Sequence, residues 1–205
     1  MIYRYLGYRG RPDAATARLV DNCAEMVEKK AKFRLVYKKY ILGHDPLTIK
    51  ELNLAIESRD LARYMAGCGE CIVTACTLGF DIDKEIRFLQ HVDMAKAVVF
   101  DRAAGRYLEQ MRDSWEKENI PGPHTFRARP GYGDIPLGLN RTLARALGAD
   151  KTLGLSVTAG GTFLPFKSML GITGLGAVSE RSCMNCVRKD SCDLLKSGRR
   201  CYQPG

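Results

Sequence analysis

The sequence lacks any long hydrophobic run. No stretch of about 18 apolar residues occurs, so the usual signal of a transmembrane helix is missing. The opening residues, Met1 to Gly7, do not contain the apolar core of a signal peptide. We therefore expect a cytoplasmic protein that does not bind a membrane.

Clustered histidines are lacking too. The 3 histidines, His44, His91 and His124, are scattered along the chain. No pairing of a nucleophile with a nearby base can be recognised either. The pattern therefore predicts neither a histidine metal site nor a catalytic triad, and we assign the histidines no role.

The sequence has no concentrated block of basic charge, although its formal net charge is +9. Lysines and arginines lie in scattered pairs such as Lys29-Lys30, Lys38-Lys39 and Arg199-Arg200. A nucleic-acid-binding surface would explain the excess charge. A docking surface for an acidic protein explains it equally well, so both interpretations stay open at this point.

What is present is the composition of an ordinary globular protein, with 205 residues, 45% of them hydrophobic and 27% charged. This length is enough for one sizeable core. Apolar periodicity predicts an α+β fold, a single domain in which a twisted, mainly antiparallel sheet is flanked by helices. The predicted helices cover residues 12–32, 59–65, 82–116 and a segment ending near 147; the predicted strands cover 33–42, 47–56, 69–78, 153–157 and 169–175.

The long predicted helix, residues 82–116, carries acidic residues on its apolar face. Helical spacing places Asp93 and Asp101 on the same stripe as the large apolar residues. A buried carboxylate must be paired or must lie beside a ligand, because bare burial costs several kcal/mol. Pairing with an arginine such as Arg127 and direct contact with a ligand are both open. Gly105, one turn after Asp101, permits close approach of a neighbour.

The most informative stretch covers residues 126–137. Arg127 and Arg129 alternate with Phe126 and Ala128, so a short strand would place both guanidinium groups on one face. We expect that face to bind a ligand. A strand–turn–helix corner with the arginines in water is the alternative.

The second half of this stretch predicts a tight turn followed by a helix. Gly131 and Gly133 allow sharp turning and close backbone approach, and Asp134 before Pro136 has the pattern of an N-cap. Two arginines, the ring of Tyr132 and a helix N-terminus would suit a carboxylate joined to a planar ring.

The 8 cysteines favour thiols or metal ligands over disulfides in an intracellular protein. Cys68, Cys71 and Cys76 are separated by Ile, Val and Ala in a predicted strand, so we expect core thiols. Four others are separated by two, five and eight residues and predict one four-thiolate site for zinc or an iron–sulfur cluster, with free thiols as the alternative. These are Cys183, Cys186, Cys192 and Cys201.

Arg127-x-x-x-Gly131-Tyr132 matches the signature of the S-adenosylmethionine-binding activation domain of cobalamin-dependent methionine synthase. The run of residues 129–137 resembles the form found in small stand-alone members of that family. Three further stretches are similar to family segments in the same order: residues 3–8, residues 75–79 and Pro165-x-Lys167-Ser168. We therefore divide the chain into an activation domain, residues 1–178, and a cysteine tail, residues 179–205.

The resemblance implies that the chain binds S-adenosylmethionine, whose methyl group is passed to cobalamin. Arg127 would bind the methionyl carboxylate, Gly131 would let the backbone approach, and Tyr132 would line the site; Arg129 joins them in the predicted ligand set. Asp101 would face the ligand and the corrinoid partner. Gly105 stands where large methionine synthases have an acidic residue, and the cysteine tail replaces their tyrosine-bearing one.

The resemblance also implies a separate partner, because no corrinoid-binding module is recognisable in the chain. The partner would be methionine synthase or another corrinoid protein, with flavodoxin or ferredoxin as electron donor. The chain would then be an accessory subunit of a cobalamin-dependent methyltransferase of methionine biosynthesis. The alternatives are a metal-stabilised, basic nucleic-acid-binding module and an iron–sulfur electron relay to a corrinoid protein.

Overall fold

The structure is a computed structural model that describes residues 3, 12–179, 182–198 and 200. The chain groups into two compact units, which are described separately below. The first unit contains Met1–Val36, Ala75–Ile120 and Ala149–Met169, and the second contains Tyr37–Thr74, Pro121–Gly148 and Leu170–Gly205. Three of the boundaries fall inside strands β1, β4 and β7, so these strands contribute residues to both units.

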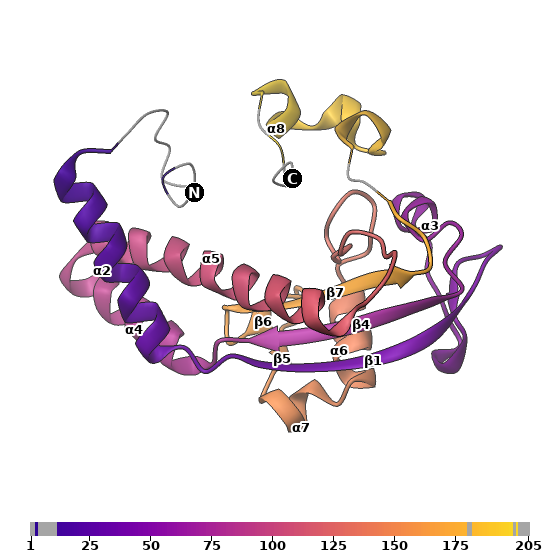
Figure 1. Ribbon diagram of the computed structural model, residues 1–205, viewed down its shortest axis with the longest axis horizontal. Helices are drawn as coiled ribbons and strands as arrows, with labels where there is room; N and C mark the ends of the chain where they lie inside the picture. Colours follow the sequence, from indigo (N-terminus) through magenta and orange to yellow (C-terminus); the bar gives the residue numbers. More distant parts are fainter. Residues whose placement is uncertain (1–2, 4–11, 180–181, 199, 201–205) are drawn as a thin grey trace. The chain divides into compact units, whose positions relative to one another are not determined.

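The α+β class is confirmed. Five strands form one sheet in the order β3-β2-β1-β4-β7. Figure 1 labels β1, β4 and β7 of this sheet. Their bounds are β1 Arg34–Gly43, β2 Thr48–Ile49, β3 Leu54–Ala55, β4 Glu70–Thr77 and β7 Ser168–Leu175. The β1–β2 and β2–β3 pairs are antiparallel, as is a separate pair formed by β5 (Ser156–Val157) and β6 (Phe163–Leu164). The mainly antiparallel sheet predicted from the sequence is therefore present.

The core of the first unit is made by helices. α2 (Ala14–Lys30) and α4 (Phe80–Val92) both contact α5 (Met94–Asn119). α2 begins where the Asp13 carboxylate accepts a hydrogen bond from the Thr16 backbone N–H at 2.8 Å. Its buried face, with Cys23 and Val27 fully enclosed, packs in the same apolar cluster as Phe100 of α5. The helical periodicity of residues 12–32 predicted this element correctly.

The span predicted as one long helix, residues 82–116, forms two helices, and α5 is the long one. Asp93 separates α4 from α5, because its backbone is extended and its carboxylate caps α5 by accepting from the Lys96 N–H at 2.9 Å. Asp93 is exposed, so its predicted place on the buried stripe is wrong. Gly105 has no described atom within 4 Å of the place where a Cβ would stand, so the expected close neighbour is not found.

Two predicted strands are shorter than expected. Residues 47–56 form β2, a 3-10 turn (Lys50–Leu52) and β3, since Asn53 adopts a left-handed conformation that reverses the chain. Helix α7 (Ala149–Leu153) occupies the start of the predicted strand 153–157, which leaves only β5. Residues 158–162 join β5 to β6, and these two short strands pair antiparallel.

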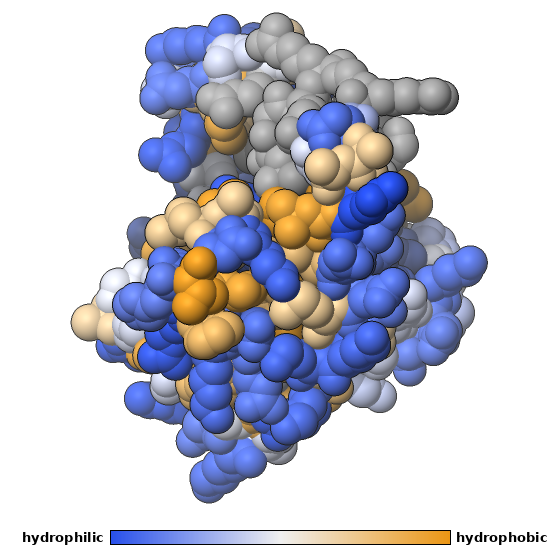
Figure 2. Space-filling model, turned by 90° about the vertical axis from the view of Figure 1, so that its left-hand side faces the viewer, coloured by the Kyte–Doolittle hydropathy of each residue, from blue (hydrophilic) through white to orange (hydrophobic). Residues whose placement is uncertain are grey.

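Apolar side chains are exposed where α4 meets α5 in the first unit. Phe88, Val92 and Met94 are each more than half exposed. The face drawn in Figure 2 shows apolar surface bordered by hydrophilic side chains. Exposed apolar area of this kind is typical of surfaces that contact other molecules.

The second unit contains residues 126–137 and the cysteine tail. Its helices are α3 (Arg59–Tyr64) and α6 (Leu139–Ala146), followed in the cysteine tail by the 3-10 turns η2 (Cys183–Asn185) and η3 (Lys189–Ser191) and by α8 (Asp193–Lys196). α3 and α6 lie where the sequence predicted helices.

The three cysteines predicted as core thiols are buried. Cys68, Cys71 and Cys76 are at most 1% exposed. Burial raises the pKa of the Cys71 thiol to about 12, so this thiol stays protonated at neutral pH. None of the helices in the described part of the chain combines the length and apolar character that a bilayer crossing requires.

Gly174 and Gly105 give a matched pair of stability predictions. A Cβ on Gly174 would stand 2.6 Å from Cys68 Sγ and 2.8 Å from Met65 Sδ, both buried. Gly174→Ala should therefore destabilise the protein by about 1–3 kcal/mol. Gly105→Ala fills open space within a helix and should stabilise it by about 0.5–1 kcal/mol. Urea unfolding measures both, and equal effects of the two substitutions would contradict this packing.

Candidate functional site

The loop of residues 126–137, hereafter the arginine loop, is anchored to strand β7. Ala128 and Ile172 exchange two backbone hydrogen bonds of 2.9 Å, and the Thr125 N–H donates to the Gly174 carbonyl at 2.9 Å. Ala128 is buried while Arg127 and Arg129 on either side are half-buried. The predicted alternation is therefore present, as isolated bridges instead of a regular strand.

The turn in the arginine loop closes through its own backbone. The Tyr132 N–H donates to the Arg129 carbonyl at 3.1 Å, and the Gly131 N–H donates to the Ile135 carbonyl at 2.9 Å. Gly131 is exposed with a φ of +90°, a conformation that favours glycine. The Arg129 guanidinium lies 5.8 Å from the centre of the Tyr132 ring, within the range of a cation–π contact. The predicted tight turn is confirmed.

Asp134 does not cap the helix that follows it. That helix, α6, begins at Leu139 with Gly138 at its N-cap. The Asp134 carboxylate instead accepts hydrogen bonds at the start of α3, from Ser58 Oγ at 2.5 Å, the Arg59 N–H at 2.8 Å and the Asp60 N–H at 3.1 Å. Burial opposes its ionisation, but these hydrogen bonds outweigh burial and hold the pKa of Asp134 below its ordinary value. The helix expected to begin at Asp134 therefore starts later, at Leu139, and Asp134 binds the N-terminus of α3 instead.

Asp60 joins three segments of the second unit. Its side chain is fully buried and pairs with Arg63 at 2.6 Å. It also accepts from the Val187 N–H at 3.3 Å and from the Cys186 thiol at 3.8 Å, both in the cysteine tail. A Cβ on Gly133 would overlap Asp60 Oδ2, so only glycine permits this approach of the arginine loop. Sequence analysis missed Asp60, which has no local signal beyond its place in the first turn of α3.

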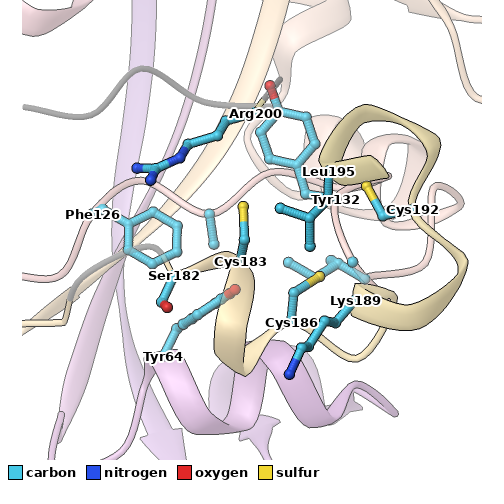
Figure 3. A pocket seen from close by; sticks show the side chains of 13 residues that line it. Tyr64, Phe126, Tyr132, Ser182, Cys183, Cys186, Lys189, Cys192, Leu195 and Arg200 are labelled. Atoms are coloured by element: carbon cyan, nitrogen blue, oxygen red, sulfur yellow. The ribbon is translucent and has the colours of Figure 1, made fainter. Parts of the chain in front are cut away.

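A cavity lies where the arginine loop, α3 and the cysteine tail meet (Figure 3). The rings of Tyr64 and Phe126 form an edge-to-face pair in its wall, with centroids 4.5 Å apart. Tyr132 and Gly133 also line it, as do three thiols of the tail and the cations Lys189 and Arg200. The thiols are those of Cys183, Cys186 and Cys192.

The structure therefore brings Tyr132 together with three of the four predicted metal ligands. Arg127, Arg129 and Gly131 belong to the same unit but do not line this cavity. Cys201 lies outside the described residues. Among the residues that are described, no three His, Cys, Asp or Glu side chains are grouped closely enough to hold a metal ion.

Asp101 lies in the first unit, where it pairs with Lys167 at 2.8 Å. The carboxylate is 37% exposed and the lysine only 16%. The segment that carries Lys167 is held by Ser168, whose hydroxyl donates to the Pro165 carbonyl at 2.7 Å. The Pro-x-Lys-Ser motif thus fixes a partner for Asp101, which sequence analysis did not identify.

Replacing Asp134 tests whether its carboxylate holds the arginine loop on α3. Asp134→Ala should lower the free energy of unfolding at pH 7 by about 0.5–2 kcal/mol, because it removes a cap from α3. The folded pKa is depressed, so this stabilisation is present above the unfolded pKa near 4 and disappears as the pH falls through the folded pKa.

The difference in free energy of unfolding between wild type and Asp134→Ala, measured in urea, should therefore decrease below about pH 4. Asp21→Ala, on the exposed face of α2, is the control and should change stability by less than about 0.5 kcal/mol. A difference in free energy of unfolding that stays constant down to about pH 2 would contradict the role of the ionised Asp134 carboxylate in holding the loop.

No family model matches the sequence, and no curated protein matches it. Among solved structures, a crystal structure of the MetH reactivation domain bound to AdoHcy is similar, with a TM-score of 0.60 and 17% sequence identity. The match covers 96% of this chain and 80% of that one. The fold implied by the motif resemblance is therefore confirmed: this chain has the fold of the MetH reactivation domain.

Proposed function

We propose that the chain binds S-adenosylmethionine and supports the reductive remethylation of cobalamin on a separate corrinoid protein, with methionine synthase as the expected partner. The observation that carries this proposal is the placement of Arg127-x-x-x-Gly131-Tyr132 on a backbone-bonded loop, in a chain whose fold is that of a domain solved with AdoHcy. AdoHcy is the product that remains when S-adenosylmethionine has lost its methyl group.

The residues of the arginine loop fit the amino-acid end of this ligand. The Arg127 guanidinium is half-buried, which strengthens its attraction for a carboxylate, and its planar fork can bind both oxygens. Gly131 is exposed and lacks a Cβ, so a ligand can reach the backbone there. Arg129 orients the Tyr132 ring against which the ligand would pack.

The bound ligand supplies an electrophilic methyl group on a sulfonium. The protein would then bind and orient the ligand, with the attacking group supplied by the partner. Lys167 would hold the Asp101 carboxylate in place through their ion pair. We propose that the exposed part of Asp101 faces the corrinoid partner.

The charge of the chain supports a protein partner that is acidic. A net charge of +9 favours encounter with an acidic corrinoid protein, and with flavodoxin or ferredoxin as electron donor. The exposed side chains of Phe88, Val92 and Met94 offer apolar contact area of the kind that protein interfaces use.

Calorimetric titration with S-adenosylmethionine and with AdoHcy tests the ligand. Arg127→Ala should weaken binding of both by roughly 10-fold to 100-fold, because charge-assisted hydrogen bonds contribute about 1.5–3 kcal/mol. Adenosine has no amino-acid end, so its affinity should be the same for wild type and variant. Arg145→Ala, an exposed arginine of α6 in the same unit, is the control. Absence of binding by the wild type, or undiminished binding by Arg127→Ala, would refute the proposal.

A reactivation assay with methionine synthase, a reductant and S-adenosylmethionine tests the role of Asp101. Asp101→Asn should slow recovery of the methylated corrinoid several-fold while leaving the calorimetric affinity for S-adenosylmethionine unchanged. Glu118→Gln, an exposed change near the end of α5, should affect neither. A normal recovery rate in Asp101→Asn would remove Asp101 from the partner interface.

A further inference from the structure

An apolar patch lies on the surface of the first unit where α4 ends and α5 begins. Phe88 and Val92 stand one turn apart on α4, and Met94 and Val98 stand one turn apart on α5. Each of these four side chains is at least 47% exposed. We call them the α4–α5 patch. Figure 2, which looks at the left-hand side of Figure 1, shows apolar surface bordered by hydrophilic side chains.

The patch continues along α5 as far as Asp101. Met94, Val98 and Asp101 are separated by four and then three residues, which places them on one side of the helix. Gly105 follows four residues later, and a Cβ there would meet no described atom within 4 Å. The patch and the carboxylate proposed above to face the corrinoid partner therefore lie on one continuous surface of α5.

The carboxylates of α4 beside the patch are already paired within the first unit. Asp81 pairs with two lysines, Lys32 at 2.7 Å and Lys84 at 3.6 Å. Glu85 pairs with Lys30 at 2.9 Å. Because two cations share Asp81, this side of the patch carries a surplus of positive charge.

Cations border the patch on both helices. Lys84 stands one turn before Phe88, and its side chain is 70% exposed. Arg102 stands one turn after Val98 and is exposed, and no described carboxylate pairs with it. Phenylalanine, methionine and arginine are enriched in protein interfaces. An apolar centre with a cationic rim is complementary to an apolar surface that is bordered by carboxylates.

We propose that the α4–α5 patch is the docking surface for an acidic protein, and that this protein is the corrinoid-carrying partner. The identity of the partner rests on the proposed function, because it is inferred from the surface that the patch shares with Asp101. The partner would cover Phe88 and Val98 with apolar side chains and would place carboxylates opposite Lys84 and Arg102.

A protein fits this surface better than an anionic membrane does. Asp93 is exposed between the two halves of the patch, where its carboxylate is fixed by the Lys96 N–H at 2.9 Å. Anionic headgroups would repel a carboxylate at this place. A protein can place a single lysine or arginine opposite it and carboxylates around it.

Binding to immobilised, cobalamin-loaded methionine synthase tests the proposal with a matched pair of substitutions. Val98→Glu places a negative charge in the patch and should weaken binding at least about 10-fold, because central interface residues carry most of the binding energy. Val178→Glu is the control and should bind like wild type, since Val178 is 71% exposed but belongs to the second unit. Circular dichroism should show the same helical content and melting for both variants.

Salt tests the cationic rim separately. The affinity of the wild type should fall several-fold between about 50 and 200 mM salt, because exposed charges are screened. Arg102→Gln should weaken binding at low salt and reduce this dependence on salt. An affinity that does not change with salt would overturn the acidic nature of the partner.

Three results would overturn the docking surface itself: no binding of the wild type to the synthase, undiminished binding by Val98→Glu, or equal weakening by Val98→Glu and Val178→Glu. Two others would assign the patch to a different occupant and overturn the proposal as well. These are a wild-type dimer in sedimentation that Val98→Glu abolishes, and binding to phosphatidylserine vesicles that the same substitution abolishes.

Calorimetric titration of the same variants with S-adenosylmethionine separates this inference from the proposed function. Val98→Glu should bind the ligand like wild type. Normal ligand binding with no docking would refute the docking surface alone. Absence of ligand binding by the wild type would refute the proposed function, whatever the docking experiment shows.

Discussion

The buried carboxylate of Asp60 is the constraint on which the second unit depends. A buried charge must be compensated, and Asp60 is compensated by Arg63 on its own helix and by a backbone N–H of the cysteine tail. Its position in turn requires glycine at residue 133, since any Cβ there would overlap the carboxylate. One side chain therefore fixes α3, the arginine loop and the tail together, and the cavity exists because these three segments are held at its edges.

Asp134 adds a second attachment of the arginine loop to α3. Its carboxylate accepts from Ser58 Oγ and two backbone N–H groups, and Ser58 Oγ itself accepts from the Leu61 N–H at 3.0 Å. The shape of the loop is therefore determined more by α3, which precedes it by some 70 residues, than by α6, which follows directly. A loop held in this way is ordered before a ligand arrives, which lowers the entropic cost of binding.

Local patterns predicted the elements and the turn but not these attachments. Helical spacing identified α2, and apolar runs identified β4 and β7, because each property is expressed within a dozen neighbouring residues. Gly131 and Gly133 identified the turn by composition. The local sequence around Asp134 is the same whether its carboxylate caps the next helix or a distant one. Asp93 likewise fits two roles equally well: a place on the apolar stripe of one long helix, and an N-cap that separates two helices. Only tertiary contacts decide between these choices, so periodicity alone could not.

The cysteine tail also shows that local sequence patterns do not determine tertiary contacts. Spacing establishes how many thiols are available, whereas the difference between a single ion and a cluster depends on how far apart the folded chain holds them. Asp60 binds the tail at the Val187 N–H and at the Cys186 thiol, so a residue of α3 fixes where this part of the tail lies. The carboxylate that positions the arginine loop thus also positions the tail, so these two walls of the cavity depend on one buried charge.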